Sequence, residues 1–73
     1  MKDTNFIDVI RYTQAATSNL SNAFNHLQDA QKAANDYRAK DFKEVVRAVN
    51  IIMNHVFLMS EEAEDERITR KNR

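Results

Sequence analysis

The chain has 73 residues, of which eleven are basic and eleven acidic, and it contains no Gly, Pro, Cys or Trp. A chain of this length forms one domain, here residues 1–73, near the lower size limit for a stable core. Without Gly or Pro, tight β-turns are hard to make, and without Cys neither disulfides nor thiolate metal sites can support a small fold. The composition therefore favours an all-α domain that gains further stability by assembly.

The first predicted element is a helix over residues 4–38. Ala16, Ala23 and Ala30 lie seven residues apart and would let a second helix approach closely. The stretch from Ser18 to Asn22 consists mainly of poor helix formers, which leaves open a break that would give a three-helix monomer. A continuous helix is favoured because a coiled-coil seam, with alternating steps of three and four, keeps its register across this stretch. The seam consists of Phe6, Ile10, Thr13, Thr17, Leu20, Phe24, Leu27, Gln31 and Ala34.

The second predicted element is a helix over residues 41–67, antiparallel to the first. Asp41 and Glu44 have the spacing of a capping box, so residues 37–40 become a short connection. An acidic block over residues 61–66 precedes several basic residues, and residues 68–73 are expected to be a frayed basic tail. The inner stripe of this helix is predicted to be Phe42, Val45, Val49, Ile52, Val56, Met59 and Ala63, widened by Val46, Met53 and Phe57.

The two predicted helices differ in length, and this difference predicts a homodimer. A turn near residue 40 puts residue i opposite roughly residue 80 − i, so that Tyr12 faces Ile68 and everything before Tyr12 projects beyond the second helix. Each large apolar side chain in that projection would cost about 1.5–3 kcal/mol to leave exposed. We therefore predict a dimeric four-helix bundle, with an interface formed by Phe6, Val9, Ile10, Leu20, Phe24, Leu27, Val49, Ile52 and Val56.

A hairpin of long helices with alanines at heptad spacing and no glycine resembles the small homodimeric helical-hairpin proteins of plasmids and phages, the Rop type. The resemblance is architectural and covers roughly residues 4–66. It implies a small regulatory or adaptor protein that acts as a homodimer. It assigns no functional residue in this chain.

The sequence carries no pattern typical of an enzyme. The acidic block lies on a solvated helix end without an apolar pocket, and neither a Gly-rich phosphate loop nor a nucleophile–base pair is present. We expect no catalysis, no cofactor and no small-molecule substrate. The two histidines, His26 and His55, would lie near one level of the bundle. No carboxylate completes a ligand set around them, so no metal site is expected.

The predicted partner surface lies on the second helix, where large apolar side chains occur on its polar half. A row of this kind is typical of helix-to-helix docking with a larger partner protein. Alternatively, the row is itself the dimer seam. It consists of Arg47, Ile51, Asn54, His55 and Leu58.

Nucleic acid, in particular RNA, is the alternative partner. Basic residues gather near the turn and at the C-terminus, although acidic residues are interleaved with them and the net charge is zero. The start of the chain lacks the features of a signal peptide, and the most apolar stretch, residues 45–59, is too short and too polar for a bilayer. We therefore expect a cytoplasmic protein without a membrane partner. The candidate nucleic-acid contacts are Arg38, Lys40, Lys43, Arg67, Arg70, Lys71 and Arg73.

Overall fold

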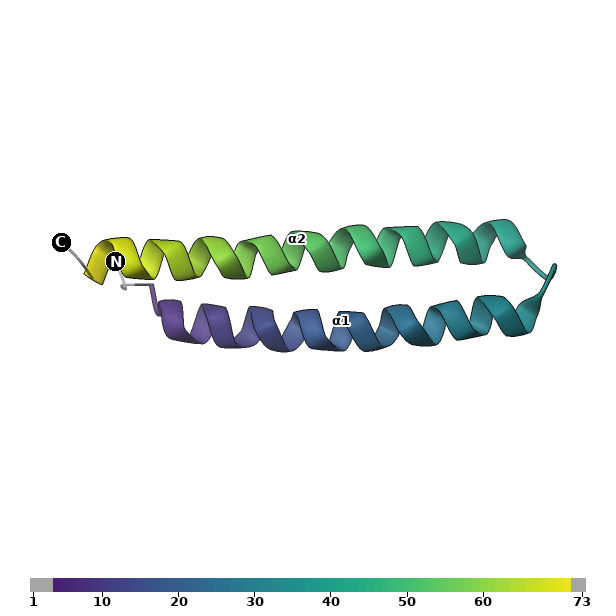
Figure 1. Cartoon of the computed structure of the whole chain (residues 1–73), viewed down its shortest axis with the longest axis horizontal. Coiled ribbons are helices and arrows are strands. Elements are labelled where there is room, and N and C mark those ends of the chain that lie inside the picture. Colours follow the sequence, from purple (N-terminus) through teal and green to yellow (C-terminus); the bar gives the residue numbers. More distant parts are fainter. Residues whose placement is uncertain (1–3, 72–73) are drawn as a thin grey trace.

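A computed structural model describes residues 4–71 as two long helices that lie side by side and antiparallel (Figure 1). Helix α1 spans Phe6–Ala34 and helix α2 spans Ala39–Lys71, and residues 4–71 contain no strand. The molecule measures 56 × 21 × 15 Å. The predicted all-α helical hairpin is confirmed, and α1 runs through residues 18–22 without a break.

Helix α1 begins with a cap and continues through its polar residues without a break. The Asn5 side chain accepts a hydrogen bond from the Asp8 amide at 3.1 Å, as expected of an N-cap. The Thr13 hydroxyl donates to the Val9 carbonyl at 2.7 Å, and the Thr17 hydroxyl donates to the Thr13 carbonyl at 2.8 Å. These threonines return their hydroxyl groups to the helix itself, so they can occupy its interface with α2.

The turn between the helices occurs earlier than the sequence predicts. Helix α1 ends at Ala34, and Asn35 and Arg38 have positive φ angles of 55° and 47°. With φ 55° and ψ −116°, Asn35 has the angles of the first central residue of a type II′ turn, a position dominated by Gly, Asn and Asp, which explains why a chain without glycine can end the helix here. The Phe42 amide donates to the Arg38 carbonyl at 3.1 Å. Helical bonding therefore starts before Asp41, which lies in the first turn of α2, and the predicted helix start at Asp41 is wrong.

The early turn changes which residues face each other. With the turn at residues 35–38, residues whose numbers add to about 73 lie at the same level. The Arg70 guanidinium accordingly lies 5.0 Å from the centre of the Phe6 ring. The predicted projection of the residues before Tyr12 is wrong, because α2 covers their level. Residues 68–71 are helical and not a frayed tail, while residues 72–73 lie outside the described residues.

The seam between the helices follows the predicted register on α1 but not on α2. All nine predicted seam residues of α1 are partly buried. On α2, Val45, Ile52 and Met59 are 45%, 51% and 48% exposed, so their assignment to the inner stripe of the hairpin is wrong. The partly or fully buried positions of α2 that form a heptad seam are Phe42, Val46, Val49, Met53, Val56, Ser60, Ala63 and Arg67.

The hairpin encloses very little. Among residues 4–70, Ser60 and Ala63 are the buried positions, 6% and 9% exposed, and no large side chain is fully buried. Two helices leave one side of each apolar stripe uncovered, because a core needs at least two packed layers. The accessible surface is 6068 Å², whereas a folded monomer of this mass typically exposes about 4,700 Å². The hairpin therefore retains apolar surface that a further layer would cover.

Candidate interaction surfaces

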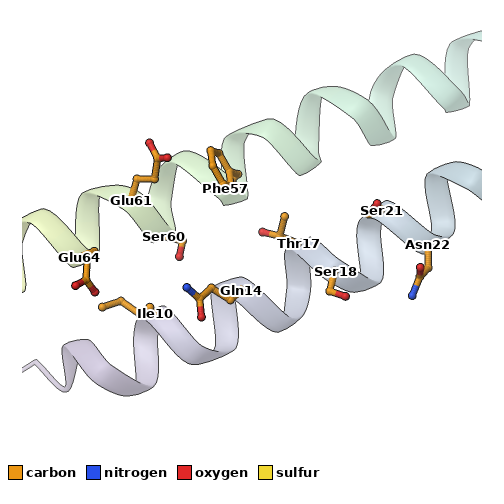
Figure 2. Close-up of a pocket in the computed structure, with 10 residues that line it drawn as sticks. All are labelled: Ile10, Gln14, Thr17, Ser18, Ser21, Asn22, Phe57, Ser60, Glu61 and Glu64. Carbon is orange, nitrogen blue, oxygen red and sulfur yellow. The ribbon is translucent and has the colours of Figure 1, made fainter.

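One flank of the seam is a groove lined mainly by polar residues, shown in Figure 2, and we call it the polar groove. The groove has a volume of about 580 Å³ and is open to solvent. Ser60 and Gln14 lie between the two helices, and Phe57, which is 49% exposed, borders the groove from α2. The hydroxyl, amide and carboxylate groups that line the groove can exchange hydrogen bonds with a bound group. The residues that line it are Ile10, Gln14, Thr17, Ser18, Ser21, Asn22, Phe57, Ser60, Glu61 and Glu64.

One residue of the polar groove, Glu64, forms an ion pair with Arg67. The Arg67 guanidinium donates to the Glu64 carboxylate at 2.8 Å. This hydrogen bond holds the pKa of Glu64 below its ordinary value, and the neighbouring carboxylate raises the pKa of Arg67. Glu64 therefore stays ionised at neutral pH. Because both side chains are more than a third exposed, solvent screens the pair and it adds little stability.

The opposite flank of the seam is apolar. Gln14 and Ser21 of α1 share the polar groove with Phe57 and Glu64 of α2, so the residues one position before every second seam residue must share the other side. On α1 three of these four residues are alanines, and on α2 three of the four are large and apolar. We call this surface the apolar flank; it comprises Val9, Ala16, Ala23 and Ala30 of α1 with Val45, Ile52 and Met59 of α2.

The predicted partner row lies on the outer side of α2. Ile51 and Leu58 are 57% and 52% exposed, and His55 between them is exposed as well. Successive helical residues are about 100° apart, so Ile51 points well away from Ile52 and the apolar flank. The exposure expected for this row is confirmed, including that of Arg47 and Asn54. We call these five residues the outer row.

The predicted dimer-interface residues divide between two surfaces. Val9 and Ile52 are 38% and 51% exposed and belong to the apolar flank. The other seven are partly buried in the seam of the single hairpin, where they already face the neighbouring helix: Phe6, Ile10, Leu20, Phe24, Leu27, Val49 and Val56. Sequence reasoning missed Val45 and Met59 as flank residues. Their signal is that each lies seven residues from Ile52, at the same heptad position.

Three of the seven predicted basic contacts pair with neighbouring acids. Arg38 pairs with Asp41 at 2.8 Å, and Arg70 pairs with Glu66 at 3.1 Å while its guanidinium covers the Phe6 ring. Arg67 pairs with Glu64, as described above. Of the other four candidates, Lys40 and Lys43 are exposed near the turn. Lys71 is the last residue of α2, and Arg73 lies outside the described residues.

The two histidines do not share a level. The register places His26 opposite roughly residue 47, about eight residues and 12 Å along the axis from His55. The prediction that they lie at one level of the bundle is therefore wrong for the hairpin. Within residues 4–71, no group of three His, Cys, Asp or Glu side chains is arranged to hold a metal ion.

Comparisons with known proteins add nothing about function, so a functional proposal rests on these surfaces. No family model, no curated protein and no solved structure matches the chain. Neither helix of the described part of the chain has a segment long and apolar enough to cross a membrane.

Proposed function

We propose that the protein is a non-enzymatic interaction module with a regulatory or adaptor role, and that it works as a homodimer. In this proposal a second hairpin covers the apolar flank to make a four-helix bundle, and the outer row binds a partner protein. The observation that carries the proposal is the set of large apolar side chains on α2 that the hairpin leaves 45–57% exposed.

The exposed area is large enough for such an assembly. The hairpin exposes 6068 Å², about 1,400 Å² more than is typical of a folded monomer of its mass. A stable interface buries about 800 Å² on each partner. One further hairpin against the apolar flank thus accounts for about 800 Å² of this excess and leaves about 600 Å². The outer row, turned about 100° away from the flank, contributes Ile51 and Leu58 as exposed apolar side chains to that remaining surface.

Sedimentation equilibrium at micromolar concentration tests the homodimer. We expect a mass twice that of the 8.5 kDa chain, with thermal unfolding that shifts to higher temperature as concentration rises. A monomer throughout the micromolar range would refute the assembly.

Affinity capture with paired variants tests the outer row. The double variant Ile51→Ser/Leu58→Ser should keep its mass and helix content but bind the captured partner at least tenfold more weakly, because each apolar anchor is worth about 1.4 kcal/mol or more. The control is Phe57→Ser, which removes an equally exposed apolar side chain from the polar groove and should leave capture unchanged. Equal loss of capture in both variants, or in neither, would refute the assignment of the outer row.

A further inference from the structure

We propose that the two hairpins pair with their turns at the same end of the bundle, each hairpin seating its α2 side chains on the alanines of the other copy's α1. This inference rests on the proposed homodimer and specifies its geometry. It follows from the shape of the apolar flank, in which one helix carries a ridge and the other a furrow.

The ridge and the furrow have the same repeat. Val45, Ile52 and Met59 occur every seven residues on α2 and are about half exposed, so they stand out from the flank. On α1 the corresponding positions also recur every seven residues, but they hold only methyl side chains, at Ala16, Ala23 and Ala30. Large side chains on one helix and small ones on the other produce a surface that is raised along one side and hollowed along the other.

The ridge and the furrow also lie at matching levels. Because residues that add to about 73 share a level, Ile52 lies at the level of residue 21, two residues from Ala23. Met59 has the same relation to Ala16, and Val45 to Ala30. Two residues correspond to about 3 Å along a helix, less than the reach of one large side chain. Each ridge residue therefore has an alanine at its own height.

The pattern changes on both helices at the same place. At the next heptad position, α1 has Val9 instead of an alanine, and α2 has Glu66 instead of a large apolar residue. The Glu66 carboxylate accepts a hydrogen bond from Arg70 at 3.1 Å and is thereby held on its own helix. The ridge ends where the furrow ends, so the complementarity of the two hairpins does not require either helix to extend beyond the other.

Two-fold symmetry allows two ways to stack such hairpins, and they differ in what meets. An axis parallel to the helices keeps every level unchanged and puts α2 of each copy on α1 of the other, so both ridges enter furrows. An axis perpendicular to the helices puts α2 on α2 and α1 on α1. Ridge would then meet ridge while alanines faced alanines, which crowds one side of the bundle and leaves space in the other. Close packing selects the parallel axis, which places both turns at one end.

Pulsed electron paramagnetic resonance on single-cysteine variants tests this arrangement, because the chain has no native cysteine. Nitroxide labels are attached to Asp36→Cys in the turn and to Thr69→Cys near the end of α2, two exposed positions outside the apolar flank. We expect short distances, roughly 20–30 Å, between two labels at position 36 and between two at position 69, because packed helices are about 8–10 Å apart. Mixed dimers with one label at each position should give a distance approaching the 56 Å length of the molecule.

The three measurements separate the possible failures. Long 36–36 and 69–69 distances with a short 36–69 distance would overturn the same-end arrangement while leaving the homodimer intact. Labelled chains that sediment as monomers and show no dipolar coupling would overturn the homodimer itself. Circular dichroism of each labelled variant checks that helix content equals that of the unmodified chain, and dilution with unlabelled chain should reduce the modulation depth without changing the distances.

Discussion

Replacing Ile52 by Ser removes the central residue of the ridge and should weaken the homodimer. Ile52 is 51% exposed in the hairpin, so about half of its side chain remains to be buried by a second copy. Complete burial of an isoleucine side chain is worth about 1.5–3 kcal/mol, and the exposed half therefore contributes about 1 kcal/mol. A two-fold dimer contains this residue twice. The variant should lose about 2 kcal/mol of association free energy, which corresponds to an increase of about 30-fold in the dissociation constant.

The neighbouring residue provides the control for this experiment. Ile51 is 57% exposed, and Ile51→Ser is the same chemical change about 100° away around the helix. Its dissociation constant should stay within about twofold of the unmodified chain, since an exposed side chain outside the interface contributes little. Sedimentation equilibrium over a range of concentrations gives both constants. An Ile51 effect as large as that of Ile52, or no effect from either, would refute the assignment of the apolar flank.

Three further predictions concern the hairpin itself. Phe6→Ala should lower the free energy of unfolding by about 2 kcal/mol in a urea titration, because Phe6 is partly buried and its ring lies beneath Arg70. The control is Ile7→Ala, at a residue 66% exposed, which should change the free energy of unfolding by about 0.5 kcal/mol or less. Equal losses in the two variants would mean that Phe6 does not pack. Asn5→Ala should cost about 1 kcal/mol in the same titration through loss of the cap, and an unchanged value would show that the cap is not formed in solution. Arg67→Gln should return the pKa of Glu64 to its ordinary value in an NMR titration. Because that pKa is lowered in the folded chain, the small stabilisation from the pair is present at neutral pH and is lost as the pH falls through the lowered pKa. An unchanged Glu64 titration in the variant would contradict the ion pair.

The first helix could be predicted from the sequence because its signal is unambiguous. Its seam keeps one register of alternating steps of three and four from Phe6 to Ala34, and its large apolar residues after Tyr12 all lie on that seam, so one register fits best and all nine positions are partly buried. The poor helix formers between residues 18 and 22 did not break it. Packing against α2 outweighs the small propensity cost of each residue.

The turn could not be predicted because it depends on backbone conformation that the residue types only weakly specify. Asn35 and Arg38 adopt positive φ angles, and Arg is not a residue that signals such a turn. The spacing of Asp41 and Glu44 suggested a later start for α2. An error of a few residues in the position of the turn changed the predicted pairing of the helices: the numbers of two facing residues were expected to add to about 80, whereas in the structure they add to about 73. It thereby produced both the false projection of the N-terminal segment and the false alignment of the histidines.

The seam of the second helix was misassigned because that helix has two apolar stripes side by side. Val45, Ile52 and Met59 fit a heptad as well as Val46 and Met53 do. Periodicity identifies apolar faces but does not say which one faces the neighbouring helix in the same chain. The exposed stripe became visible only when the structure showed which face α1 covers. The outer row was easier to predict, because Ile51 and Leu58 stand among polar residues.

A hairpin without a fully buried large side chain has consequences for how long the protein survives in a cell. If the free energy that keeps the chain folded comes largely from covering its apolar flank, folding and pairing form one equilibrium, and the folded fraction rises with the amount of protein made. At low expression most chains would be unfolded monomers open to proteolysis, whereas at high expression dimerisation would keep the chains folded and protected. Expression level would then set a threshold for activity by itself, without a ligand or a covalent modification.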